Sequence, residues 1–332
     1  MKFRLIFPEP IARYAYIDKI QFWVIDPLDQ YTLDLLKAEC GKGGLFVINK
    51  RARFDHRFRQ RVQLRQPTEN ALRLLAQRND VLINGVEITL DLIFKNRAEK
   101  EETFDFMHQH LVRRWHGSRQ EIRVYRGRQL VEDDDIGQSR YDAGRPAPNT
   151  IAVYLENFTR VTGELNCLHI EWRAKGVRAT RAAGINTPGD LLVFNHRAFW
   201  QKRLLFYSVS RRQLGRLIRN RATGRRRRTP EIICKTPATI QKGKFQYRID
   251  IEARTGEVFA RSYDTVQQLI DALKRLCCIR RALIPISNEM LLPPKHTYLL
   301  YTQTTCQLDP VLAQKSDLLP IEELRHGGLI CC

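Results

Sequence analysis

Residues 167–173, CLHIEWR, contain the alternation that decides the fold class of this chain. Three apolar side chains, Leu168, Ile170 and Trp172, alternate with three polar ones, His169, Glu171 and Arg173. Successive side chains of a β-strand point to opposite faces of a sheet. The pattern therefore predicts a strand with one apolar face, packed under helices, and one polar face.

Two other segments repeat this pattern. In 86–91, VEITLD, Glu87 and Asp91 fall on the polar side, and in 151–156, IAVYLE, Tyr154 does. If the three strands share a sheet, its polar face collects all of these side chains: Glu87, Asp91, Tyr154, His169, Glu171 and Arg173.

The rest of the chain predicts further strands and helices in alternation. Strands are expected at 18–25, 45–48, 59–65, 121–127 and 245–253, and residues 81–94 predict a long strand or a hairpin around Asn84–Gly85. Helices are expected at 30–39, 69–78, 97–114, 175–183, 189–222 and 265–277, and 131–149 is expected to be a polar loop. Because several strands are joined as hairpins, the fold class is α+β, with a mostly antiparallel sheet and helices on one face.

The length of 332 residues predicts two or three domains. We expect a first domain at 1–187, a helical basic segment at 188–228 and a small C-terminal domain at 229–332, whose role the sequence does not indicate.

The charge balance predicts a polyanionic partner. Lys and Arg number 56 against 36 Asp and Glu, a net charge of +20, which favours nucleic acid first and an acidic membrane second. No stretch approaches the roughly 18 apolar residues of a membrane span, and no signal peptide is evident. The eight cysteines form no CxxC pair, and no P-loop or GxGxxG motif occurs. We therefore expect a cytosolic protein that is neither a zinc-ribbon protein nor an ATPase.

The strongest concentration of charge is at 211–228, RRQLGRLIRNRATGRRRR, which contains no acid. Its nine arginines are Arg211, Arg212, Arg216, Arg219, Arg221, Arg225, Arg226, Arg227 and Arg228. Each arginine that contacts a phosphate adds salt-dependent affinity for nucleic acid. The segment predicts a helix along or in a DNA groove followed by a phosphate-binding tail, and the alternative is a solubilising linker.

The polar face carries the residue types of metal-assisted phosphodiester chemistry. Carboxylates held close together repel unless a cation lies among them, so Glu87, Asp91 and Glu171, with His169, are candidate ligands for Mg²⁺ or Mn²⁺. Tyr154 is a candidate nucleophile and Arg173 a candidate for stabilising the transition state. The alternative is an ordinary half-buried sheet whose outer face carries cross-strand ion pairs.

Four segments in this order resemble the Rep_trans family of rolling-circle replication initiators of plasmids and filamentous phages. They are YIDKIQFWV at 16–24, NGVEITLDLIF at 84–94, TIAVYLENFTR at 150–160 and CLHIEWRAKGVRA at 167–179. They match that family's "ID-x-hydrophobic", "hydrophobic-D", "Y-[DE]-K" and "R-x-E-x-R" strands, over roughly residues 17–185. Two departures stand out: Leu155 and Glu156 replace the residues after the tyrosine, and His169 replaces the first arginine.

The resemblance implies a site-specific, metal-dependent endonuclease that nicks and closes DNA. Its tyrosine becomes linked to the 5′ end of origin DNA and leaves a free 3′-OH as primer. Tyr154 matches the tyrosine, Glu171 and Arg173 match the "R-x-E-x-R" strand, and Asp91, with Glu87, matches the acidic strand. Tyr141, in the segment SRYDAGRPAPN expected to be a loop, is a second candidate nucleophile.

The resemblance also implies the cofactor and partners. These are Mg²⁺ or Mn²⁺, origin DNA that is single-stranded or in a cruciform, a second copy of the chain and a host helicase, in a bacterial cytoplasm and without a membrane. A non-catalytic DNA-binding regulator of a plasmid or phage is the alternative, and it predicts binding without a covalent adduct.

Overall fold

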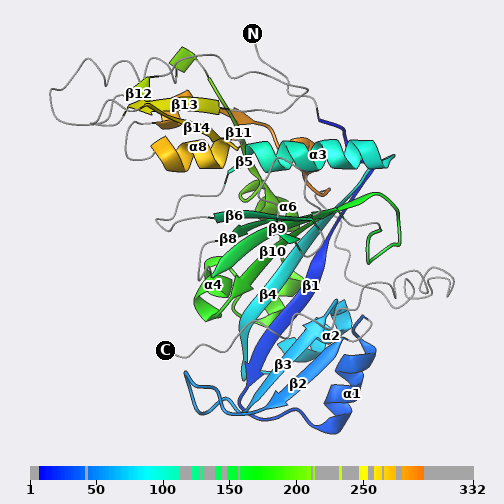
Figure 1. Cartoon of the computed structure of the whole chain (residues 1–332). Helices are drawn as coiled ribbons and strands as arrows, with labels where there is room; N and C mark the ends of the chain where they lie inside the picture. Colours follow the sequence, from blue (N-terminus) through cyan, green and yellow to red (C-terminus); the bar gives the residue numbers. More distant parts are fainter. Residues whose placement is uncertain are drawn as a thin grey trace.

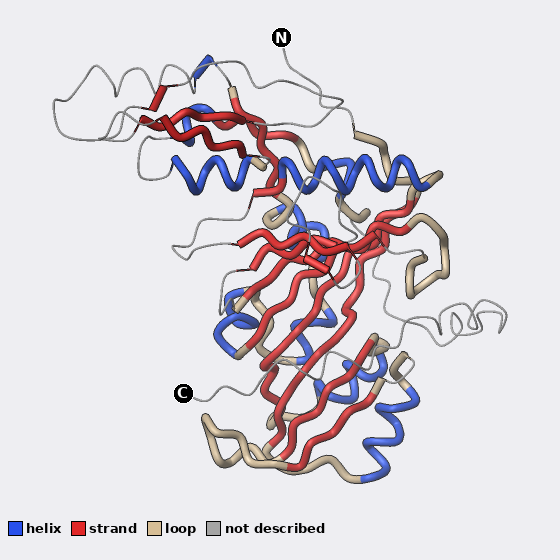
Figure 2. The backbone as a smooth tube through the Cα atoms, in the orientation of Figure 1, coloured by secondary structure: helices blue, strands red, loops and turns tan. Residues whose placement is uncertain are grey.

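The structure is a computed structural model in which the main element is one large antiparallel sheet (Figures 1 and 2). It describes residues 7–41, 44–112, 121–126, 129–130, 139–143, 148–155, 158–210, 212–213, 232–233, 247–252, 258–263, 265–273 and 279–294. Every pair of neighbouring strands in the sheet is antiparallel, and helices accompany it. The predicted α+β class is confirmed.

The large sheet has nine strands, in the order β2-β3-β1-β4-β10-β9-β8-β6-β7. In that order their bounds are Leu45–Asn49, Gln60–Arg65, Ala12–Val24, Val81–Ile93, Cys167–Lys175, Asn149–Leu155, Ser139–Ala143, Glu121–Arg126 and Gln129–Leu130. The three segments with the clearest alternation, β4, β10 and β9, are neighbours at the centre of this sheet, as the pattern predicts.

Helices cover the apolar face of the large sheet and share its core. They are α1 (Gln30–Ala38), α2 (Glu69–Ala76), α3 (Arg97–His110), α4 (Val177–Ala182), α5 (Pro188–Leu192) and α6 (His196–Gln201). Leu36, Leu72, Leu191 and Trp200 pack in one buried cluster with strand residues such as Ile88 and Ile170. In the described ranges no helix is long and apolar enough to cross a membrane.

Side chains that cap the first helices fix where they begin. Asp29 accepts a hydrogen bond from the backbone N–H of Thr32 at 2.7 Å, and Thr68 accepts one from Ala71 at 3.2 Å. Such caps satisfy backbone N–H groups that have no partner inside the helix. They place α1 and α2 directly after the turns that leave β1 and β3.

Strand β1 contains an irregularity that matters for the site. Ile17 pairs with Ile88 and Lys19 pairs with Glu87, so Asp18 is an extra residue between two consecutive pairs. A bulge of this kind re-aims the bulged side chain and shifts the alternation by one residue. Tyr16 before the bulge and Lys19 after it therefore both belong to the polar face, although the spacing between them is odd.

Two smaller sheets use parts of the chain that lie far apart in sequence. One has the order β15-β11-β5, with bounds Leu283–Ile286, Leu205–Val209 and Leu111–Val112. The other has the order β12-β13-β14, with bounds Ile232–Ile233, Tyr247–Glu252 and Val258–Tyr263. Helix α8 (Val266–Leu273) follows, and the turns η1 (Ile279–Ala282) and η2 (Glu289–Leu291) flank β15.

Two local expectations are wrong, and a third, which left two alternatives open, is decided. Residues 205–209 form strand β11 rather than helix, because pairing with β5 and β15 overrides the local pattern. Of the two alternatives expected at 81–94, the long strand is confirmed, because residues 81–93 form one strand and Asn84–Gly85 is not a hairpin turn. Residues 139–143, expected in a loop, form β8. The expected helix over the basic segment cannot be compared, because 211 and 214–228 lie outside the described residues.

Candidate active site

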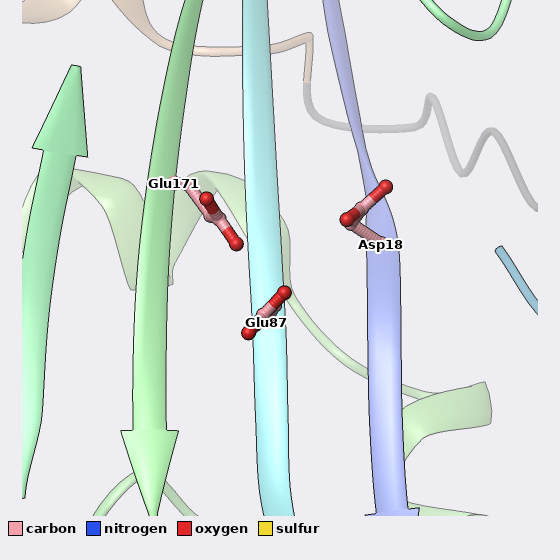
Figure 3. Close-up of side chains that lie close together, drawn as sticks. All are labelled: Asp18, Glu87 and Glu171. Atoms are coloured by element: carbon pink, nitrogen blue, oxygen red, sulfur yellow. The ribbon is translucent and has the colours of Figure 1, made fainter. Parts of the chain in front are cut away.

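Three carboxylates from three adjacent strands meet on the polar face of the large sheet. Asp18 of β1, Glu87 of β4 and Glu171 of β10 each offer an oxygen, and these oxygens all lie within 4.8 Å of one another (Figure 3). Asp18 and Glu171 are buried, and Glu87 is half-buried. We call these residues the carboxylate cluster. Oxygen donors of this kind suit a hard divalent cation such as Mg²⁺ or Mn²⁺.

Among the described residues, two cations border the carboxylate cluster, and they do not balance its three acids. The Lys19 ammonium contacts Glu87, and Arg173 Nη2 donates a hydrogen bond to Glu171 Oε2 at 2.7 Å. Arg173 Nε also lies 3.8 Å from Glu87 Oε1. With all three acids ionised, the five groups carry a net negative charge, which favours uptake of a further cation or a proton.

The pKa values of the two glutamates move in opposite directions. Burial raises the pKa of Glu87 to about 7, and the Glu171 carboxylate adds to this rise. Burial alone would also raise the pKa of Glu171, but the hydrogen bond and charge of Arg173 outweigh it and hold that pKa well below its ordinary value. Of these two glutamates, Glu87 is therefore the one that takes up a proton first.

Arg173 links the carboxylate cluster to Tyr154. The same Nη2 donates to the Tyr154 hydroxyl oxygen at 2.7 Å. Tyr154 is half-buried on β9, and its ring lies against that of His169, with the centroids 5.6 Å apart. A guanidinium at this distance stabilises negative charge on the phenolic oxygen.

Two tyrosines of β1, Tyr14 and Tyr16, lie on the same face, but Arg173 does not donate to their hydroxyl groups. Burial and the hydrogen bond to Glu164 raise the pKa of Tyr14 to about 12. Burial and the Asp91 carboxylate raise the pKa of Tyr16 well above its ordinary value, and Tyr16 donates to Asp91 Oδ2 at 3.2 Å. Both hydroxyls are therefore held in the neutral form, whereas Tyr154 has a cation on its oxygen.

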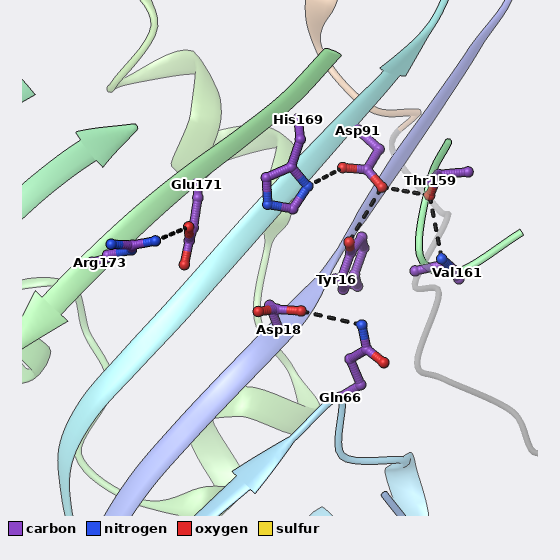
Figure 4. Close-up of polar contacts among 9 residues, drawn as sticks. All are labelled: Tyr16, Asp18, Gln66, Asp91, Thr159, Val161, His169, Glu171 and Arg173. Carbon is purple, nitrogen blue, oxygen red and sulfur yellow. Dashed lines mark hydrogen bonds and ion pairs between the residues drawn. The ribbon is translucent and has the colours of Figure 1, made fainter. Parts of the chain in front are cut away.

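Asp91 and His169 form a second buried group, which we call the histidine network. His169 Nδ1 lies 2.7 Å from Asp91 Oδ1, and Asp91 Oδ2 accepts hydrogen bonds from Tyr16 and Thr159 (Figure 4). Burial lowers the pKa of His169, but the Asp91 charge outweighs it and raises the pKa to about 8. The structure therefore gives Asp91 and His169 each other as partners and does not bring them into the carboxylate cluster.

The remaining predicted site residues are placed less fully. Tyr141 lies in β8, where its backbone pairs with Ala152, which in turn pairs with Glu171 of β10. It is therefore on a strand two positions from β10 rather than in a loop, and its side chain is outside the described residues. Arg212 is exposed, and the other arginines of the basic segment are outside the described residues.

The sequence pattern did not select Asp18. In an unbroken strand Asp18 would fall on the face opposite Lys19 and Gln21, among the apolar residues. The signal that could have found it is the "ID" of YIDKIQFWV, where an acid interrupts the apolar positions of a strand. The bulge resolves that conflict by turning Asp18 to the polar face.

Comparison with known proteins adds little to this geometry. No protein-family model matches the sequence, and no curated protein matches it. A solved structure, the rolling circle replication initiator protein from Geobacillus stearothermophilus, is similar with a TM-score of 0.32 and 10% sequence identity. The similarity covers 55% of this chain and 80% of that chain. A TM-score of this size does not bear on function, so membership of the Rep_trans family stays a prediction.

Proposed function

We propose that this protein is a DNA-nicking enzyme that acts as a replication initiator, with Tyr154 as the nucleophile and a divalent cation at the carboxylate cluster. The observation that carries the proposal is the position of the Arg173 guanidinium. Arg173 contacts both Glu171 of the cluster and the Tyr154 hydroxyl, each at 2.7 Å. A nucleophile and a candidate metal ligand are thereby held by the same side chain.

The residues present fit a divalent cation. The cluster offers three oxygen donors within 4.8 Å of one another, and the two neighbouring cations leave one negative charge uncompensated. Asp18, Glu87 and Glu171 would hold the ion. A bound Mg²⁺ or Mn²⁺ supplies charge stabilisation for the oxygens of the phosphodiester.

The side chains of this chain account for the other requirements of the reaction. Tyr154 Oη forms the bond to phosphorus, the bond from phosphorus to the 3′ oxygen breaks, and the products are a 5′-phosphotyrosine and a 3′-OH. The tyrosine proton leaves and a proton is taken up by the 3′ oxygen. Arg173 stabilises the phenolate before attack, and it can stabilise charge on the phosphoryl group during attack.

A covalent-adduct assay tests this proposal. The full chain is incubated with Mn²⁺ and labelled single-stranded oligonucleotides that tile its own gene and flanking DNA, and adducts are resolved on a denaturing gel. We expect an SDS-stable adduct with the unaltered protein and none with Tyr154→Phe. Tyr14→Phe is the matched control, because it removes a hydroxyl from the same face.

The other outcomes distinguish the alternatives. An adduct that survives Tyr154→Phe and disappears in Tyr141→Phe assigns the nucleophile to β8. Tight, salt-dependent DNA binding without an adduct on any tile favours a non-catalytic regulator. In that protein Lys19 would serve as the cross-strand partner of Glu87, and Arg173 as the partner of Glu171 on the same strand.

A further inference from the structure

The loop between β2 and β3, residues 50–59, carries a dense positive charge that the site above does not use. Its sequence is KRARFDHRFR, with a single acid, Asp55, which Arg57 engages through hydrogen bonds of 2.7 and 3.1 Å. The other basic residues are Lys50, Arg51, Arg53 and Arg59, all exposed. Within the part of the chain that the structure describes, none of these four has an acidic partner. The loop thus presents cations that a polyanion would neutralise.

An aromatic side chain stands among these cations. Phe54 is 56% exposed, and it meets the edge of Trp23 with ring centroids 5.8 Å apart and planes at 86°. The ring of Phe58 also packs against Phe54, with the centroids 5.8 Å apart. Trp23 is only 6% exposed, yet it is not part of the main core cluster, because it lies on the polar face of the sheet. Phe54 is therefore an exposed ring that packs against the buried Trp23.

The loop backbone holds this ring in place. Ala52 N–H donates to the Phe58 carbonyl at 2.9 Å, and Arg59 N–H donates to the Val24 carbonyl at 3.0 Å. Ala52 is fully buried. These contacts close the loop on itself and tie it to the end of β1, so that an exposed aromatic is presented with little freedom to lose on binding.

A polar strip on the same face connects the loop to the carboxylate cluster. Trp23 pairs with Arg61, and Arg61 donates to Gln21, which donates to Gln63, at 2.8 and 2.7 Å. Gly85 lies opposite Gln21, and a Cβ there would come within 3.1 Å of the Gln21 amide oxygen, so the glycine leaves room for that side chain. Trp23 is four residues from Lys19, or about 13 Å along the strand.

We propose that this surface, made of the 50–59 loop and the Gln21–Arg61–Gln63 strip, binds the unpaired DNA that flanks the phosphodiester held at the carboxylate cluster. Phe54 stacks on a base, and Arg51, Arg53 and Arg59 contact phosphates. An exposed aromatic ring among arginines that have no acidic partner in the described ranges fits single-stranded rather than duplex DNA, because paired bases are already stacked on each other. The placement beside the cluster rests on the proposed function, while the binding itself does not.

The test is the affinity for a thymidine oligonucleotide of about 12 nucleotides, within the usual site sizes for such surfaces. Fluorescence anisotropy is measured in EDTA, so that no nicking occurs. We expect Phe54→Ala to weaken binding about tenfold, and Phe54→Trp to restore it. Tyr31→Ala, which removes an aromatic side chain 74% exposed on α1, is the matched control and should leave the affinity unchanged.

Salt and duplex titrations separate the roles of ring and cations. Arg53→Gln should lower the slope of log affinity against log salt by about 0.7, whereas Phe54→Ala should leave the slope unchanged. Phe54→Ala should also leave binding of a duplex of the same length unchanged. The inference is overturned if Phe54→Ala matches Tyr31→Ala on the single strand, or if it weakens single strand and duplex equally. The adduct assay is a separate measurement. If the unaltered protein forms an adduct but Phe54→Ala does not change single-strand binding, this inference fails and the proposed function stands.

Discussion

The carboxylate cluster and the histidine network lie on one sheet face, share strands β1, β4 and β10, and yet differ in how their charges are satisfied. In the histidine network both carboxylate oxygens of Asp91 meet partners: Oδ1 meets His169, and Oδ2 accepts from Tyr16 and Thr159. In the carboxylate cluster three acids face two cations. Acids are buried in both groups, so the two groups differ in how much of the acidic charge is compensated by the described residues.

The difference also separates a structural role from a chemical one. A buried ion pair that is fully hydrogen-bonded rigidifies the strands around it. A cluster of like charges destabilises the fold, and such a cluster persists where function requires it. Four predictions test this contrast. Neutralising an acid should lower the stability of the metal-free protein in the histidine network, and it should not do so in the carboxylate cluster.

The largest effect is expected in the histidine network. Asp91→Asn removes the charge that pairs with a buried His169, which should lower the free energy of unfolding by about 3–5 kcal/mol. Urea denaturation followed by tryptophan fluorescence at pH 7 measures it. A loss below about 1 kcal/mol would show that the network is not a structural ion pair.

Metal affinity should depend on the carboxylate cluster. Glu171→Gln removes a ligand from the carboxylate cluster and should weaken Mn²⁺ binding by about 100-fold. Calorimetric titration of the DNA-free protein measures this. Glu164→Gln is the matched control, because it removes a carboxylate that lies outside the cluster, and it should bind Mn²⁺ like the unaltered chain. Equal affinity in both variants would contradict a metal at Glu171.

The pH dependence of stability should sharpen the contrast. The folded-state pKa of His169 is raised to about 8, against about 6.5 in the unfolded chain. The folded state therefore keeps a proton that the unfolded state loses. Its contribution, about 2 kcal/mol, is fully present below pH 6.5 and is lost as pH rises through 8. Unfolding curves from pH 6 to 9 should show this loss in the unaltered chain. His169→Gln should remove the loss above about pH 7 and leave the loss that the raised pKa of Glu87 adds up to about pH 7.

The smallest effect is expected at Asp18. Asp18→Asn relieves repulsion in the carboxylate cluster while keeping an acceptor for Gln66, so the metal-free protein should be as stable or more stable, by up to about 1 kcal/mol. Thermal unfolding in EDTA measures this change. The same substitution should abolish stabilisation by added Mn²⁺. Marked destabilisation in EDTA would instead mean that Asp18 is a structural acid like Asp91.

The fold class and the polar face could be predicted from the sequence because both depend on a period of two. β4, β9 and β10 alternate cleanly, so the alternation alone assigns Glu87, Glu171, Arg173 and Tyr154 to one face. Alternation shows which face a side chain is on, but it does not show which side chains of that face are close together. Asp91 lies four residues from Glu87, about 13 Å, so a shared face did not make them neighbours.

What the sequence could not supply depends on non-local pairing. The bulge that turns Asp18 to the polar face is defined by the register of β1 against β4. Packing of the whole sheet sets that register. The strand at 205–209 likewise exists because β5 and β15 pair with it. Neither partner lies within the window that a local pattern covers.

The bulge at Asp18 has an evolutionary consequence. Ile17 and Lys19 already pair with consecutive residues of β4, Ile88 and Glu87. Loss of the single codon for Asp18 would therefore join two halves of β1 that keep their present partners. One in-frame deletion would remove a candidate ligand and leave β1 without this bulge. If the proposed function holds, a lineage could thus gain or lose the metal site in a single genetic event while it keeps the shape of the sheet.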